Sequence, residues 1–171
     1  QVAAGGKVKL TATVKKGYAF LGWYDLMTGD TEPVSQATTY SLVSDGEADR
    51  FLEARFVKES ELSEADIALD WNAPTEIYLG VSYSAKPSVS GAAAVKIASV
   101  TGLPKGLAWA SGKATGVPTS VQTNTVTVKF ALVTNAKKTF AQKFRLAVNP
   151  LPVCRSQIRA YFSRSTFNSL P

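Results

Sequence analysis

Apolar and polar residues alternate with a period of two through much of the first 58 residues. The clearest example is residues 7–14, in which the even-numbered positions are apolar and the odd-numbered positions are Lys or Thr. Such alternation is typical of a β-strand that buries one face. Strands of the same kind are predicted at residues 18–24, 38–43 and 50–57, because turn-forming Gly, Asp and Pro residues separate these segments.

These four predicted strands carry motifs in a specific order. The motifs are G-x-V-x-L-T-A-T from residue 6, G-Y-x-F-x-G-W-Y from residue 17 and R-x-L-x-A-R-F from residue 50. Together they resemble the internalin-type B repeats of bacterial surface proteins over residues 5–58. The resemblance implies a small β-rich, grasp-like unit without catalytic residues, strung in tandem between the cell wall and a ligand-binding tip. It also places Trp23 in the core, and we expect the adjacent Gly22 to form a β-bulge.

A polar segment without periodicity follows the first four strands. It reads KESELSE and spans residues 58–64. A charged, aperiodic stretch of this kind is typical of a boundary between domains. We therefore predict a first domain at residues 1–59 and a second at residues 60–149.

Strand patterns resume after this segment with different motifs. Residues 77–83 alternate as one continuous strand, and residues 125–132 and 140–148 alternate as a long hairpin that turns at Asn135-Ala136. Between them lie two corners rich in Gly and Pro, VTGLPKGL from residue 100 and GKATGVPT from residue 112. These features resemble the Ig-type domains of bacterial surface proteins, which are related to cadherin-like sandwiches.

The predicted fold class is therefore all-β. A small grasp-like repeat domain precedes an Ig-like β-sandwich, and residues 150–171 form a C-terminal extension that resembles neither family. In this extension Ile158, Tyr161 and Phe162 fall at helical spacing over a basic face. A short amphipathic helix and an irregular tail are both compatible with that pattern.

The composition removes most catalytic chemistry. The 171 residues include no His and a single Cys, Cys154, which excludes Ser-His-Asp and Cys-His catalysis and histidine zinc sites. The last acidic residue is Glu76, so paired-carboxylate catalysis and Asp/Glu calcium sites are excluded from the rest of the chain. At the junction, Glu64, Asp66 and Asp70 could hold a cation, although exposed carboxylates there usually bind only water. We expect no enzyme activity, no cofactor and no metal.

The net charge of +6 is concentrated after Glu76, where 12 basic residues face no acidic side chain. The predicted hairpin would place Lys129 directly opposite Lys143, with Arg145 nearby. Because like charges opposed on a sheet repel, an anionic partner such as an acidic polysaccharide would relieve them. The alternative is a solvated face whose lysines discourage strand addition. The loop lysines Lys137 and Lys138 are expected to join this candidate ligand-binding group.

Two tryptophans offer a second kind of candidate. Trp71 and Trp109 could stack on sugar rings, since flat aromatic side chains suit that use. In β modules a tryptophan more often fills a core or a domain junction. The position of Trp71 close to the KESELSE segment favours packing between the two domains.

These observations predict a monomeric structural or adhesive spacer of a bacterial cell-surface or secreted protein. Its partners would be a polysaccharide or protein of the host or cell surface. No 18-residue apolar stretch predicts membrane insertion, and no nucleic-acid-binding motif is present. We expect an extracellular or cell-surface location, with targeting signals outside this sequence. The alternatives are a module that binds glycans or acidic surface polymers, and accessory domains of a larger secreted hydrolase.

Overall fold

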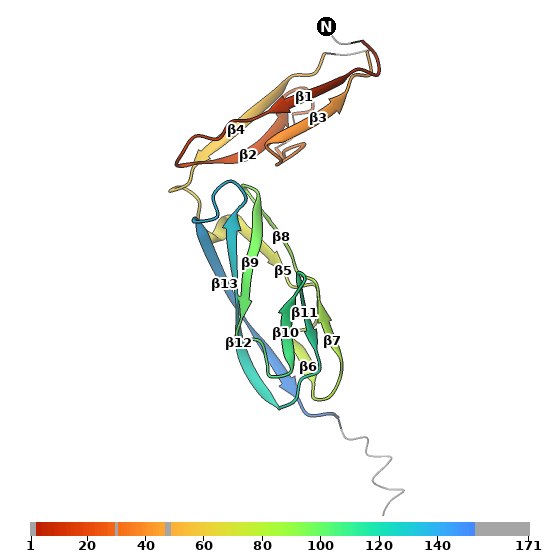
Figure 1. The fold of residues 1–171 in the computed structure, drawn as a ribbon, viewed down its shortest axis with the longest axis vertical. Helices are drawn as coiled ribbons and strands as arrows, with labels where there is room; N and C mark the ends of the chain where they lie inside the picture. Colours follow the sequence, from red (N-terminus) through yellow and green to blue (C-terminus); the bar gives the residue numbers. More distant parts are fainter. Residues whose placement is uncertain (1–2, 30, 47–48, 153–171) are drawn as a thin grey trace, which may run out of the picture.

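The protein consists of two β-structured bodies joined end to end (Figure 1). The computed structural model describes residues 3–29, 31–46 and 49–152. Within these residues every regular element is a β-strand except the short 3-10 turn η1 (Glu64–Asp66), which confirms the all-β prediction. Cys154 and the predicted helical pattern at Ile158 lie outside the described residues.

The N-terminal unit contains four strands in two separate two-stranded sheets. The strands are β1 (Lys7–Thr11), β2 (Tyr18–Asp25), β3 (Thr39–Val43) and β4 (Leu52–Lys58). β1 pairs with β3 and β2 pairs with β4, both antiparallel. In β1 and β3 exposed and half-buried residues alternate as predicted, although β1 ends three residues earlier than the sequence pattern does.

A β-bulge divides β2, as the sequence predicted. The register with β4 shifts between Phe20 and Gly22, and Gly22 has φ +151°, a conformation that favours glycine. A Cβ atom at Gly22 would lie 2.4 Å from the Cβ of Pro33. The bulge allows both Phe20 and Trp23 to be buried, with their rings in an edge contact at 5.7 Å. Trp23 is thus a core residue of this unit, and its Nε1–H donates to the Ala37 carbonyl.

The remaining strands form a β-sandwich. They are β5 (Ile67–Asp70), β6 (Glu76–Tyr78), β7 (Tyr83–Ala85), β8 (Ser88–Gly91), β9 (Val95–Thr101), β10 (Leu107–Ala110), β11 (Lys113–Gly116), β12 (Gln122–Leu132) and β13 (Thr139–Asn149). One sheet has the order β6-β13-β12-β9, and the other layer contains β10-β11-β7 and β5-β8. The predicted long hairpin is β12–β13, and its turn is closed by the Lys138 amide donating to the Asn135 carbonyl.

The predicted continuous strand at residues 77–83 is wrong. The chain leaves β6, turns at residues 79–82 and enters β7, which belongs to the opposite layer. Gly80 adopts φ +74° in this turn, and Val81 is exposed. Ile77 and Tyr83 are both buried because they approach one core from two layers, which produces the same alternation as a single strand.

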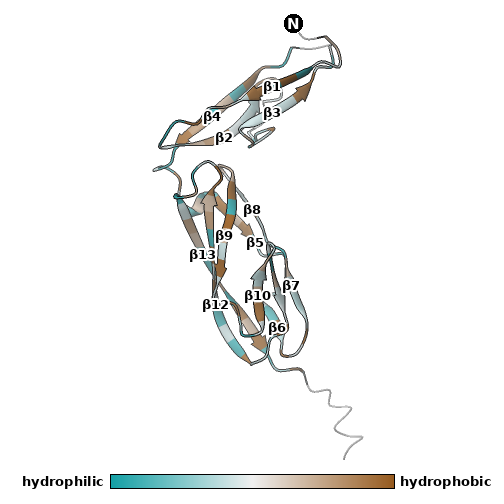
Figure 2. Cartoon of the chain, viewed as in Figure 1, coloured by the Kyte–Doolittle hydropathy of each residue, from teal (hydrophilic) through white to brown (hydrophobic). Residues whose placement is uncertain are grey.

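Apolar side chains of the hairpin fill the space between the layers. Along the strands, hydrophobic and hydrophilic residues alternate (Figure 2). At the centre, the Trp71 ring packs on Phe144 with centroids 4.7 Å apart. Trp71 Nε1–H donates to the Tyr83 hydroxyl at 2.6 Å, and that hydroxyl donates to the Pro74 carbonyl at 3.1 Å. The predicted placement of Trp71 between the domains is therefore wrong, because the residue lies inside the sandwich.

Replacing Tyr83 by Phe should destabilise the protein by about 1–3 kcal/mol, because the buried Trp71 N–H loses its acceptor. The matched control is Tyr78→Phe, at an exposed position, which should change the free energy of unfolding by less than about 0.5 kcal/mol. Urea denaturation monitored by tryptophan fluorescence measures both. Equal stability of the two variants would contradict the role of this hydrogen bond.

The same pair of variants tests the ionisation of Tyr83. Burial raises the pKa of Tyr83 above its ordinary value of 10.0. Its stabilising contribution is therefore complete below that value and is lost as the pH rises through the higher pKa of the folded state. Alkaline destabilisation should be smaller in Tyr83→Phe than in the wild type, and unchanged in Tyr78→Phe.

Candidate functional site

The predicted basic residues of the hairpin lie on the outer face of the four-stranded sheet. Lys129 on β12 and Lys143 and Arg145 on β13 are all exposed. Along each strand the outward-facing positions alternate with buried ones, so these three side chains share one face. Lys129 is paired with Ala141, and Lys143 is paired with Thr127. The direct opposition of the two lysines that the sequence suggested is therefore wrong.

The turn of the hairpin explains the difference. It sets Ala131 against Thr139, so each outward position on β12 meets an outward position on β13. This register offsets Lys143 from Lys129 by two residues along the strand. Diagonal neighbours of this kind lie about 7–8 Å apart, which is farther than a directly opposed pair.

A fourth cation, Lys96 on β9, extends this group to a third strand. Lys96 is exposed and is paired with Ala131, which places it on the same face. Lys96 could not be identified from the sequence, because β9 contains an irregularity at residue 98 that changes which side chains face outward. We call the resulting set the diagonal stripe: Lys96, Lys129, Lys143 and Arg145. One cation stands in each of four successive outward-facing pairs of the sheet, and an inward-facing pair separates each from the next.

The two loop lysines do not join the stripe. Lys137 is exposed on the hairpin turn, where its backbone amide donates to Asn135 Oδ1 at 3.1 Å. Lys138 places its ammonium 5.1 Å from the ring centroid of Phe140, a buried residue that faces the core. Of the five basic residues predicted to form one group, three therefore lie on the sheet and two lie apart from it.

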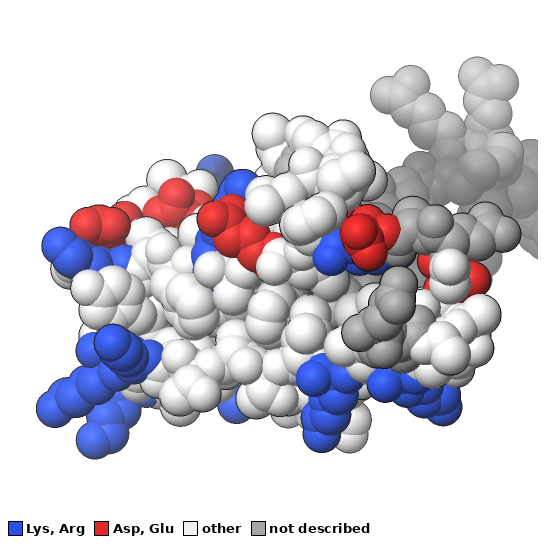
Figure 3. All heavy atoms as spheres, turned by 90° about the horizontal axis from the view of Figure 1, so that it is seen from above, with Lys and Arg blue, Asp and Glu red and all other residues white. Residues whose placement is uncertain are grey.

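The diagonal stripe is not neutralised by ion pairs. Within the described ranges, the salt bridges join Arg50 to Asp25, Arg55 to Glu53 and Lys58 to Glu61, all before residue 62. Seen along the long axis, Lys and Arg side chains occur on both sides of the molecule, whereas the visible Asp and Glu side chains lie mainly on one side (Figure 3). Since the screening length is about 8 Å at physiological salt, neighbouring cations of the stripe reinforce one another's potential.

Two carboxylates border the outer face. Glu76 on β6 is paired with Ala147, two residues beyond Arg145 and on the same face. Glu64 accepts a hydrogen bond from the Ala141 amide at 3.3 Å, at the edge of β13. Both lie on the β6 side of the sheet, so the β9 and β12 side is the more positive.

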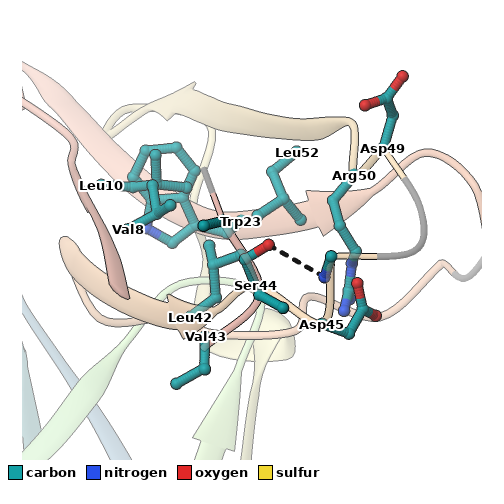
Figure 4. A pocket seen from close by; sticks show the side chains of 13 residues that line it. Val8, Leu10, Trp23, Leu42, Val43, Ser44, Asp45, Asp49, Arg50 and Leu52 are labelled. Atoms are coloured by element: carbon teal, nitrogen blue, oxygen red, sulfur yellow. Dashed lines mark hydrogen bonds between the residues drawn. The ribbon is translucent and has the colours of Figure 1, made fainter. Parts of the chain in front are cut away.

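A second feature is an open hollow in the N-terminal unit, of about 890 Å³ (Figure 4). It lies between the two small sheets, and its apolar wall is formed by Val8, Leu10, Trp23, Leu42 and Leu52. Its rim carries the charged residues Asp45, Asp49 and Arg50. The sequence did not reveal this hollow, because the strand pattern alone does not show that the four strands form two separate sheets.

Asp25 anchors Arg50 beside this hollow. Its side chain is 2% exposed, and Oδ2 accepts from Arg50 Nη2 at 2.7 Å and from Nε at 3.1 Å. Oδ1 accepts from the Met27 amide at 3.0 Å. These hydrogen bonds, that of Met27 most, together with the charge of Arg50, lower the pKa of Asp25.

The other candidates have structural roles. Trp109 is half-buried and packs against the core of the sandwich, so it does not form a free stacking platform. At the junction, Asp66 accepts from the amide and hydroxyl of Ser63, and Asp70 accepts from the Asn72 amide. Across the part of the chain that the structure describes, no three Cys, Asp or Glu residues are grouped as metal ligands.

The fold of the second unit defines an Ig-like β-sandwich, with an antiparallel hairpin at its centre and two facing layers. Residues 60–149 match the sequence family described as Putative Ig domain, and the chain belongs to this family. Domains of this family are typically non-catalytic. No curated protein matches the chain. In the described ranges no helix has the length and apolar character needed to cross a membrane.

Acid should weaken the N-terminal unit through Asp25. A lowered pKa means that the carboxylate stabilises the fold above its ordinary value of 3.8, and that this contribution is lost as the pH falls through the lower pKa of the folded state. Asp25→Asn should therefore lose less stability than the wild type between pH 6 and pH 2. Arg50→Gln should retain part of the acid sensitivity, because the Met27 amide remains. Thermal unfolding across this pH range measures the effect, and identical profiles for all three proteins would contradict it.

Proposed function

We propose that this chain is a structural spacer segment of a bacterial cell-surface or secreted protein. In this proposal residues 1–59 are a B-repeat-like module and residues 60–149 are an Ig-like module, arranged in tandem. The described chain begins at one end of the molecule and reaches residue 152 at the other (Figure 1). Such an arrangement keeps the two ends of the described chain apart.

The observation that carries this proposal is the contact between the two modules. The Gln36 side-chain amide donates to the Gly91 carbonyl at 2.8 Å, which joins the N-terminal unit to the end of β8. The Asn135 side-chain amide donates to both carboxylate oxygens of Glu59, at 3.0 and 2.9 Å, which joins the hairpin turn to the connecting segment. The junction is thereby held at two separate points.

Apolar packing supports the same contact. Leu62, in the connecting segment, is buried, and it belongs to a continuous cluster that includes Ala19 of β2 and the core of the sandwich. Leu21 and Val57 pack against this cluster from the N-terminal unit. The connecting segment is also tied back by the Glu59 amide, which donates to the Gly17 carbonyl at 2.9 Å.

A spacer works by limiting the angles that its modules can adopt. A flexible linker would let the end-to-end distance collapse, whereas a buried leucine and two pairs of polar contacts oppose bending. Because the junction is small, the polar contacts at Gln36 and Asn135 should be decisive for the angle.

Small-angle X-ray scattering of the full chain tests the proposal. The wild type should give a narrow distribution of inter-module distances, and Gln36→Ala/Asn135→Ala should broaden it. The control Asn124→Ala/Asn149→Ala removes two side-chain amides from β12 and β13, away from the junction, and should leave the distribution unchanged. Circular dichroism verifies that both variants are folded. A broad distribution in the wild type would refute the spacer.

A further inference from the structure

We propose that the diagonal stripe binds a linear acidic polysaccharide laid across β9, β12 and β13. This inference goes beyond the spacer and does not rest on it, because it concerns the outer face of one sheet and not the junction. The residues involved are exposed, and within the described chain no ion pair involves them. What the stripe offers is a row of separated positive charges on a flat surface.

The spacing of the charges favours an extended polymer over a compact anion. Residues two apart on one strand are about 6.6 Å apart, and diagonal neighbours on adjacent strands are about 7–8 Å apart. A single small anion contacts at most two of these groups, whereas a chain with repeated carboxylates or sulfates contacts all four. Arg145, at one end of the row, can additionally donate two parallel hydrogen bonds to one carboxylate.

The floor between the cations favours sugars. Thr101, Ser99, Thr127 and Thr125 present small hydroxyl-bearing side chains on this face, opposite or beside the cations. Hydroxyls both donate and accept hydrogen bonds, as sugar hydroxyls do. Single-stranded nucleic acids, in contrast, are usually bound by aromatic platforms. The aromatic residue in this sheet that shares the outer face is Tyr78, on the far strand β6, beyond the end of the stripe.

The two bordering carboxylates restrict the path that a bound polymer can follow over the sheet. Glu76 pairs with Ala147, two residues beyond Arg145, and Glu64 lies at the β13 edge. Both would repel a polyanion that ran toward β6. The polymer is therefore expected to follow the diagonal from Arg145 up to Lys96 and to leave the sheet over β9.

The test compares two variants of equal charge. Lys96→Gln/Lys129→Gln/Lys143→Gln removes three cations of the stripe, and Lys86→Gln/Lys105→Gln/Lys113→Gln removes three exposed lysines from other surfaces of the same sandwich. Binding of the full chain and of both variants to polygalacturonate and to dextran sulfate is measured by calorimetry at low salt, with uncharged dextran as the blank. Circular dichroism and thermal unfolding verify that the variants keep the fold.

The stripe variant should bind either acidic polymer roughly tenfold more weakly than the wild type, whereas the control variant should lose less than about threefold. The polymer that binds more tightly identifies carboxylate or sulfate as the preferred group. Equal losses in the two variants would show attraction by net charge alone and would overturn the proposal. No binding of either polymer by the wild type would also overturn it, as would tighter binding of single-stranded DNA than of both polysaccharides.

Discussion

The register of the β12–β13 hairpin is the constraint on which the rest of the sandwich depends. Alternate residues of each strand face opposite sides, so the same pairing that buries Val126, Val128 and Leu146 also turns Lys129 and Lys143 to solvent. A shift of one residue would exchange the two sets and place charges in the core. Because burying an unpaired charge is costly, the apolar interior fixes the pattern of charges on the exterior. The same register therefore determines both the stability of the fold and the arrangement of charges on its basic face.

The junction between the two units depends more on polar contacts than on apolar packing. Apolar packing contributes little to this junction, because Leu62 is the only large apolar residue of segment 58–64 that is more than nine-tenths buried. The orientation of the two units is set by hydrogen bonds between groups at fixed positions, such as the bond from the Gln36 side-chain amide to the Gly91 carbonyl. An interface of this type sets an angle more than it adds affinity, which suits modules that are covalently linked already.

Much of the fold could be read from the sequence, and its limits have physical causes. Alternation in residues 7–14 and the hairpin after residue 121 depend on local pattern alone, and both were predicted well. The break at residues 79–82 was missed because two strands that enclose one core from opposite layers mimic a single alternating strand. For the basic face, the three hairpin cations were found, but Lys96 required the pairing of β9, and Lys138 required knowledge of the Phe140 ring. The break at residues 79–82 and the position of Lys96 depend on long-range pairing, which local pattern does not encode, whereas the Lys138 contact depends on how one side chain folds over the Phe140 ring two residues away.

The last strand of the sandwich has a further property. β13 pairs antiparallel with β12 on one side and parallel with β6 on the other, and the Thr75 and Leu79 backbones extend the parallel contact at both ends. The chain enters this body at η1, passes through β5 to β6, and leaves it through β13. A tensile force applied between the two ends would slide β6 and β13 past each other, so that their hydrogen bonds bear the load together instead of opening one after another. This pairing would make the module resistant to extension along the line between its two ends.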